Sequence, residues 1–149
     1  MSSLKERLQQ DWKDALKQKE KFKAGVISMA KAAVLMAEKA DGSSLNDDQI
    51  IEVLAKEVKQ RRDAMLEFEK GNRQDLVDSV SAEIEILLQY LPKQLTEDEI
   101  RQIVVESAKK LGANSMKDMG KIMSDIRAAV SGRADGKVVS QIVKDYLNK

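Results

Sequence analysis

The chain has 149 residues, of which 34% are charged and 42% are hydrophobic, and it contains one proline, no cysteine and no histidine. Without imidazole or thiol groups it lacks the ligands of ordinary structural zinc and haem sites, the usual His-dependent and Cys-dependent nucleophiles, and any means of forming a disulfide bond. Because 26 basic and 25 acidic residues leave a net charge of +1, attraction to a charged partner must arise from how the charges are distributed.

The first ninety residues are predicted to form four long helices, because their apolar residues recur at helical spacing and never alternate with period two. Two stripes of this kind are Leu4, Leu8, Trp12 and Leu16, then Val26, Met29, Ala33 and Met36. After a turn, Asn46 and Gln49 predict a capping box for a third helix, which Gly71 ends. A fourth apolar stripe runs over Val77–Leu91.

Pro92 is the only proline, and it divides the chain because its ring excludes the preceding residue from helical geometry. Three shorter helices are expected after it, over Glu97–Leu111, Met116–Val130 and Lys137–Leu147. The expected fold is therefore all-α. We expect an N-terminal bundle of about four helices over residues 1–92 and a small three-helix domain over residues 93–149.

Helix starts in the second part carry recognisable capping residues. Thr96 with Glu99, and Ser115 with Asp118, have the spacing of an N-cap followed by an acidic residue in the first turn. Gly120 falls inside a predicted helix, where glycine is less favourable than alanine by roughly 1 kcal/mol. This position therefore predicts close approach by another helix or by the backbone of a ligand.

Positive charge increases toward the C-terminus. Residues 1–92 contain 15 basic and 17 acidic residues, whereas residues 93–149 contain 11 and 8. From residue 108 onward, nine basic residues stand against four acidic ones. The final third is therefore the part most suited to a polyanion.

The N-terminal eight residues are charged and amphipathic, unlike a secretory signal peptide. No apolar run approaches the roughly 20 residues that a membrane-spanning helix needs. We therefore expect a cytoplasmic protein that does not interact with membranes.

The segment Gly132-Arg-Ala-Asp-Gly-Lys137 combines glycines with basic residues. It is not a Walker A motif, because its glycines are too close together, valine follows the lysine, and no strand precedes it. One interpretation is a helix-to-helix turn in which Gly132 ends one helix and Asp135 caps the next. The other adds contact between phosphate and the side chains of Arg133 and Lys137 beside an exposed helix N-terminus.

Lys117 and Lys121 are four residues apart, which places them on one face of the predicted helix. Two ammonium groups on one face suit a phosphate backbone, although a solvated helix surface has the same pattern. The carboxylates do not form a pair with a reason for separated pKa values. We therefore predict no catalytic residue, metal ligand or cofactor site.

Several separated motifs together resemble one protein family, the YqeY family. These motifs are Val58-Lys-Gln-Arg61, Gly71-Asn-Arg-Gln-Asp-Leu76, Leu91-Pro-Lys-Gln-Leu95 with the following Thr-Glu-Asp-Glu-Ile100, Lys117-Asp-Met-Gly-Lys-Ile-Met123 and Gly132-Arg-Ala-Asp-Gly-Lys137. The resemblance implies a two-part helical protein whose C-terminal part is similar to the tail domain of the GatB subunit of the tRNA-dependent amidotransferase. In that enzyme the tail domain grips the tRNA, and the chemistry lies in a larger domain that this chain is too short to contain.

The leading hypothesis is a non-catalytic module that binds tRNA or another structured RNA. Its expected contacts are Lys117, Lys121, Arg133 and Lys137. One alternative is a protein-interaction adaptor in the translation or amidotransferase machinery. Another is an accessory chain of a glutamine-dependent tRNA amidotransferase, which the family label associates with carbon–nitrogen ligase activity. The oligomeric state stays open, and a monomer is compatible with the sequence.

Overall fold

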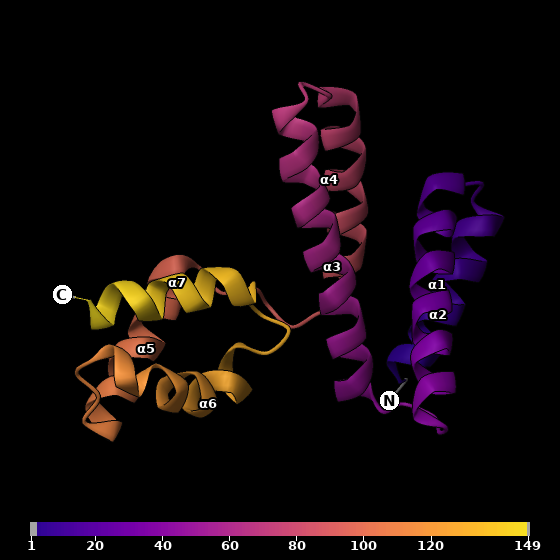
Figure 1. The fold of residues 1–149 in the computed structure, drawn as a ribbon. Helices are drawn as coiled ribbons and strands as arrows, with labels where there is room; N and C mark the ends of the chain where they lie inside the picture. The colour runs from indigo at the N-terminus through magenta and orange to yellow at the C-terminus, as the bar shows by residue number, and fades with distance from the viewer. Residues whose placement is uncertain (1–2, 149) are drawn as a thin grey trace. The chain divides into compact units, whose positions relative to one another are not determined.

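The computed structural model describes residues 3–148, which form α-helices and one short 3-10 helix, with no β-strand in that range (Figure 1). The helices are α1 (Leu4–Lys17), α2 (Lys21–Asp41), α3 (Asp47–Lys70), α4 (Gln74–Leu88), α5 (Glu97–Leu111), the 3-10 helix η1 (Met116–Asp118), α6 (Met119–Val130) and α7 (Gly136–Leu147). The predicted all-α class is confirmed. The chain divides into two compact units, one ending at Pro92 and the other beginning at Lys93.

The N-terminal unit packs the hairpin α1–α2 against the hairpin α3–α4. Each helix contributes one apolar face to a shared core. The largest fully buried side chains of this core are Leu8, Ile27, Ile50, Leu54 and Leu87. Burial of a side chain of this size contributes about 1.5–3 kcal/mol relative to exposure.

The apolar stripe predicted for α2 is confirmed at Val26, which is buried, but it is wrong at Met29 and Met36, which are 51% and 72% exposed. The core also receives Ile27, Ala30 and Val34. The helix has apolar residues around most of its circumference, so helical spacing fits more than one face. The packing of α2 against α1, α3 and α4 together selects the face that is buried.

Side-chain caps fix the starts of two helices where the sequence predicts them. The backbone N–H of Gln49 donates to Asn46 Oδ1 at 2.9 Å, and the N–H of Glu99 donates to Thr96 Oγ1 at 3.1 Å. Both sites are reciprocal capping boxes, because the side chains of Gln49 and Glu99 accept from the cap residues. Gly112 ends α5 in the left-handed region at φ 67°, which glycine adopts without a Cβ clash.

A polar contact joins α1 to the segment that follows α4. The hydroxyl of the buried Tyr90 donates a hydrogen bond to the carboxylate of Asp11 on α1. The guanidinium of Arg7 lies 5.1 Å from the centre of the Tyr90 ring and donates to the carbonyl of Gln89 at 3.3 Å. Burial and the Asp11 carboxylate raise the pKa of the Tyr90 hydroxyl. Tyr90 therefore stays a protonated donor that holds the end of the α3–α4 hairpin against α1.

Replacing Tyr90 by phenylalanine should lower the free energy of unfolding by about 1–2 kcal/mol, because Asp11 loses its donor while the ring still packs. Urea unfolding followed by circular dichroism measures this loss. The matched change Asp11→Asn should have a smaller effect, since an amide oxygen still accepts the bond. Equal stability of wild type and Tyr90→Phe would show that this contact does not hold the unit together.

The C-terminal unit is a three-helix module with its own core. Its fully buried side chains include Ile100 and Val104 on α5, Ile122 on α6, and Val139 and Val143 on α7. A module of this size buries a smaller share of its surface than a larger domain does. Polar contacts between its helices therefore add a substantial part of its stability.

One such contact connects α5 to α6 through Asp125. Its carboxylate accepts from the hydroxyl of the buried Ser107 at 2.7 Å and from Lys110 Nζ at 2.8 Å. These two hydrogen bonds hold the pKa of Asp125 below its ordinary value. The bond from Ser107 also satisfies a buried hydroxyl, which would be costly to leave without a partner.

Acid should weaken the C-terminal unit through Asp125. A carboxylate with a lowered folded-state pKa stabilises the fold above its unfolded pKa, and the contribution is lost as the pH falls through the folded pKa. Wild type should therefore lose more unfolding free energy than Asp125→Asn between about pH 5 and pH 2. Urea unfolding across this range, followed by amide resonances of α5 and α6, measures the difference. Glu106→Gln removes an exposed carboxylate on α5 as a control, and parallel profiles for wild type and Asp125→Asn would contradict the prediction.

Candidate nucleic-acid interface

The turn between α6 and α7 has the form that its glycine and aspartate predict. Gly132 adopts the left-handed region at φ 73° shortly after α6 ends. Asp135 is the N-cap of α7, and its carboxylate accepts from the backbone N–H of Lys137 at 2.9 Å. The helix-to-helix turn is therefore confirmed as one role of this segment.

Arg133 in this turn braces the C-terminal unit. Its Nε donates to the carbonyl of Lys93 at 3.1 Å, and an Nη donates to the carbonyl of Ala129 at 3.4 Å. The Arg133 carbonyl accepts from the N–H of Leu95 at 2.8 Å, and the Gln94 side chain donates to a neighbouring carbonyl of the turn. These bonds tie the segment before α5 to the α6–α7 turn. Two nitrogens of the guanidinium are thus already engaged within the protein.

The start of α6 differs from the prediction. A single helix from Met116 is wrong, because residues Met116–Asp118 form the separate 3-10 helix η1 and α6 begins at Met119. The side chain of Ser115 makes no cap hydrogen bond. Instead the carboxylate of Asp118 accepts from the N–H of Asn114 at 3.1 Å, and this bond lowers the pKa of Asp118.

Lys117 therefore lies in η1 and Lys121 in α6. The prediction that they share one face of a single α-helix is wrong. Both side chains are exposed. Lys121 Nζ lies 3.8 Å from Asp118 Oδ1, and an ion pair this exposed is weak and easily exchanged for a phosphate. The basic groups at the start of α6 remain accessible to a ligand.

The four predicted contact residues form two pairs and not one cluster. Lys117 and Lys121 lie at the start of α6, whereas Arg133 and Lys137 follow its end. Because α6 has 12 residues, its axis is about 18 Å long. Lys137 is exposed in the first turn of α7. This spacing suits a ligand with several phosphates better than a single small anion.

Gly120 lies between the two lysines in the first turn of α6. A Cβ built at this position would meet nothing within 4 Å. No other helix of the described residues therefore accounts for the missing side chain. The prediction of close approach by another helix is therefore not confirmed within this range, and approach by the backbone of a ligand stays a prediction.

A groove of about 430 Å³ between α6 and α7 adds a basic residue that the sequence analysis missed. Arg127 lines it from α6, and Gly136 lines it at the amino end of α7. Arg127 and the amino end of α7, where negative charge is favoured, thus line the same groove. Residue spacing does not reveal this site, because it depends on how α6 and α7 pack.

The structure also separates engaged cations from accessible ones. Lys110 is held by Asp125, and Arg101 pairs with Glu97 and Asp98 at 3.2 and 2.8 Å.

Within residues 3–148, no group of three or more acidic side chains has the arrangement of a metal site. Over the same range, no helix is long and apolar enough to cross a membrane.

Comparisons with known proteins identify the family of the chain. Residues 5–147 match the family described as Yqey-like protein. The chain is 27% identical over 144 residues to the mitochondrial altered inheritance of mitochondria protein 41 of Pyrenophora tritici-repentis, covering 95% of this chain and 79% of that protein. It is 29% identical over 80 residues to an uncharacterised protein of Schizosaccharomyces pombe, covering 54% of this chain and 65% of that protein. Because the family match spans nearly the whole chain, this protein belongs to the YqeY family.

Proposed function

We propose that this protein is a non-catalytic binding module whose C-terminal unit binds tRNA or another structured RNA. The observation that carries the proposal is the start of α6, where exposed Lys117 and Lys121 flank Gly120 and open space takes the place of a side chain. A phosphate backbone fits such a surface, because it needs nearby positive charge and close access to the protein backbone.

The distribution of charge supports an extended RNA contact. Arg127, Arg133 and Lys137 provide further basic groups beyond the start of α6. Their separation along α6 matches a ligand with many phosphates, and such contacts hold structured RNA by its shape and backbone with little reading of sequence. The resemblance of this unit to the tRNA-gripping tail domain of GatB supports the same class of ligand.

The proposal covers binding and not amide transfer. An amidotransferase role would place this chain beside a separate catalytic partner, with the RNA held by the C-terminal unit. The cytoplasmic location stays a prediction, because the name of one relative assigns that relative to mitochondria.

Replacing Lys117 and Lys121 together by glutamate should weaken tRNA binding on the order of tenfold or more at about 0.1 M salt and flatten the dependence of log affinity on log salt by about two units. Fluorescence anisotropy with labelled tRNA at several salt concentrations measures both quantities.

The double change Lys13→Glu and Lys17→Glu is the matched control, because these lysines are also exposed and four residues apart, on α1. It should leave RNA binding nearly unchanged. Equal losses in the two double variants would indicate unspecific attraction of a polyanion. No loss at Lys117 and Lys121 would contradict the proposed interface.

Alanine at position 120 should separate folding from binding. Gly120→Ala should raise the free energy of unfolding by up to about 1 kcal/mol through helix propensity, because its Cβ meets no neighbour. The same Cβ should weaken RNA binding if a phosphate backbone approaches there. Thermal unfolding and tRNA anisotropy measure the two effects. A variant that is more stable and binds RNA as tightly as wild type would show that the RNA does not approach Gly120.

A further inference from the structure

A second exposed surface lies in the N-terminal unit, on the side of α2 that faces away from the core. Phe22, Met29 and Met36 are 49%, 51% and 72% exposed. They are seven residues apart, so they lie on one face of the helix, and this spacing is typical of a helix that packs against another helix. We call these three side chains the outer face of α2.

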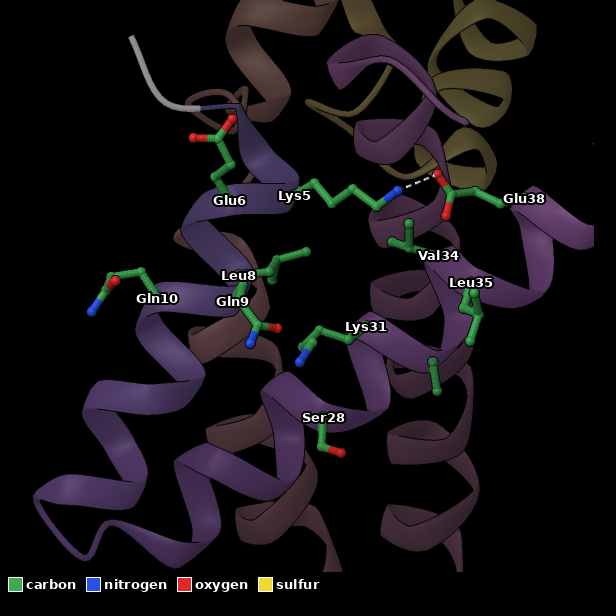
Figure 2. Close-up of a pocket in the computed structure, with 11 residues that line it drawn as sticks. Lys5, Glu6, Leu8, Gln9, Gln10, Ser28, Lys31, Val34, Leu35 and Glu38 are labelled. Carbon is green, nitrogen blue, oxygen red and sulfur yellow. Dashed lines mark hydrogen bonds and ion pairs between the residues drawn. The ribbon is translucent and has the colours of Figure 1, made fainter. Parts of the chain in front are cut away.

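The outer face continues into a groove between α1 and α2. The groove has a volume of about 670 Å³, and Leu8, Ala32 and Leu35 provide apolar parts of its lining. Figure 2 shows Ser28, Lys31 and Leu35 on α2 across from Gln9 on α1. Ala32 lies three residues after Met29 and four before Met36, so it lies beside the outer face and connects it to the groove. One elongated ligand can therefore cover both the outer face and the groove.

Gly25 lies in the interior of α2 on the same face, three residues after Phe22 and four before Met29. A Cβ at this position would meet nothing within 4 Å, although glycine costs about 1 kcal/mol relative to alanine inside a helix. Nothing in the described chain accounts for this cost. Gly25 and the small side chain of Ala32 together allow another backbone to approach α2 closely.

Lysines lie at both ends of this surface. Lys17 and Lys21 flank the end near Phe22, and Lys39 follows Met36. In the described chain, these three lysines have no ion-pair partner.

The carboxylates nearby do not cancel this charge. Glu38, which lines the groove, is held by Lys5 Nζ at 2.7 Å and by the N–H of Leu45 at 3.0 Å, and both bonds lower its pKa. Glu6 and Glu20 are exposed carboxylates near the surface, but Lys17 and Lys21 outnumber Glu20 at the end near Phe22. At the other end the exposed Asp41 is two residues after Lys39 in α2, so it points to another side of the helix. The apolar centre therefore lies between lysines that have no ion-pair partner in the described chain.

These charges select one kind of partner. A second copy of this chain would place Lys21 against Lys39 in an antiparallel arrangement, or like lysines against each other in a parallel one, and like charges at an interface are unfavourable. A helix with acidic residues at its ends complements the lysines, and its apolar side chains fit the groove. A flat lipid surface would leave the concave region between α1 and α2 unfilled.

We propose that the groove between α1 and α2, with the outer face of α2, binds an amphipathic helix of a partner protein that carries acidic residues at its two ends. The site lies in the N-terminal unit and is independent of the proposed RNA interface. It would let one chain bind an RNA and a protein at the same time.

The test uses two synthetic helical peptides without tryptophan that share one apolar heptad pattern and differ only in having glutamate or lysine at the ends. Trp12 is the single tryptophan of the chain, and Lys31 Nζ, from a residue that lines the groove, lies 4.1 Å from the centre of its ring. Its fluorescence therefore reports binding to the full-length protein. The glutamate peptide should bind saturably and at least about tenfold more tightly than the lysine peptide at low salt.

Met29→Glu should weaken binding of the glutamate peptide by about tenfold or more, because it places a charged carboxylate against the apolar side chains of the peptide. Leu66→Glu, at a side chain 55% exposed on α3, is the matched control and should bind as wild type does. Both positions are exposed, so circular dichroism and thermal unfolding should show intact folds. Gly25→Ala should stabilise the protein and weaken peptide binding.

The proposal fails if neither peptide binds, or if the lysine peptide binds as tightly as the glutamate peptide. It also fails if only vesicles of anionic phospholipid change Trp12 fluorescence, which would indicate a membrane surface. A concentration-dependent dimer that Met29→Glu abolishes would assign the face to a second copy instead. Because Met29→Glu should retain tRNA affinity, the outcome here is distinguishable from failure of the proposed RNA interface.

Discussion

Burial of one apolar face per helix, in two separate cores, is the constraint on which the architecture depends. Helices as short as α6 and α7, with 12 residues each, are marginal in water when isolated, so packing supplies most of their stability. Leu54 and Val104, which are fully buried in the two cores, illustrate how each unit holds its helices by packing. The helix faces that do not contribute to a core are exposed to solvent. The two surfaces proposed for binding, at the start of α6 and on the outer face of α2, are made of such faces.

Helix starts can be predicted from the sequence where the interactions that fix them join residues close together in the chain. The capping boxes at Asn46 and Thr96 need only residues three positions apart, so sequence spacing contains the whole interaction. The buried face of α2 depends on packing against α1, α3 and α4, so spacing alone wrongly assigns Met29 and Met36 to the core. The predicted start of α6 is wrong for a related reason. Spacing places Asp118 in the first turn of a helix, but its carboxylate instead accepts a hydrogen bond from the backbone N–H of Asn114.

Some features of the proposed RNA site can be predicted from local sequence, and others depend on how the helices pack. The exposure of Lys117 and Lys121 follows from their charge and their place near a helix start. The bracing role of Arg133 does not, because it depends on carbonyls of a segment about forty residues away in the chain. Arg127 was missed because its groove exists only when α6 and α7 are packed. Single residues at turns are thus predictable, whereas sites made by two helices are not.

The contact between Asp11 and Tyr90 also affects how the chain matures during synthesis. The hairpin α1–α2 leaves the ribosome before the hairpin α3–α4, since chains fold from the N-terminus as they are made, but Tyr90 lies 79 residues after its partner Asp11. Until then, α2 presents to the cell both its future core face and its outer face. Packing of α3 and α4 against this hairpin then buries the core face, whereas the outer face stays exposed in the complete N-terminal unit.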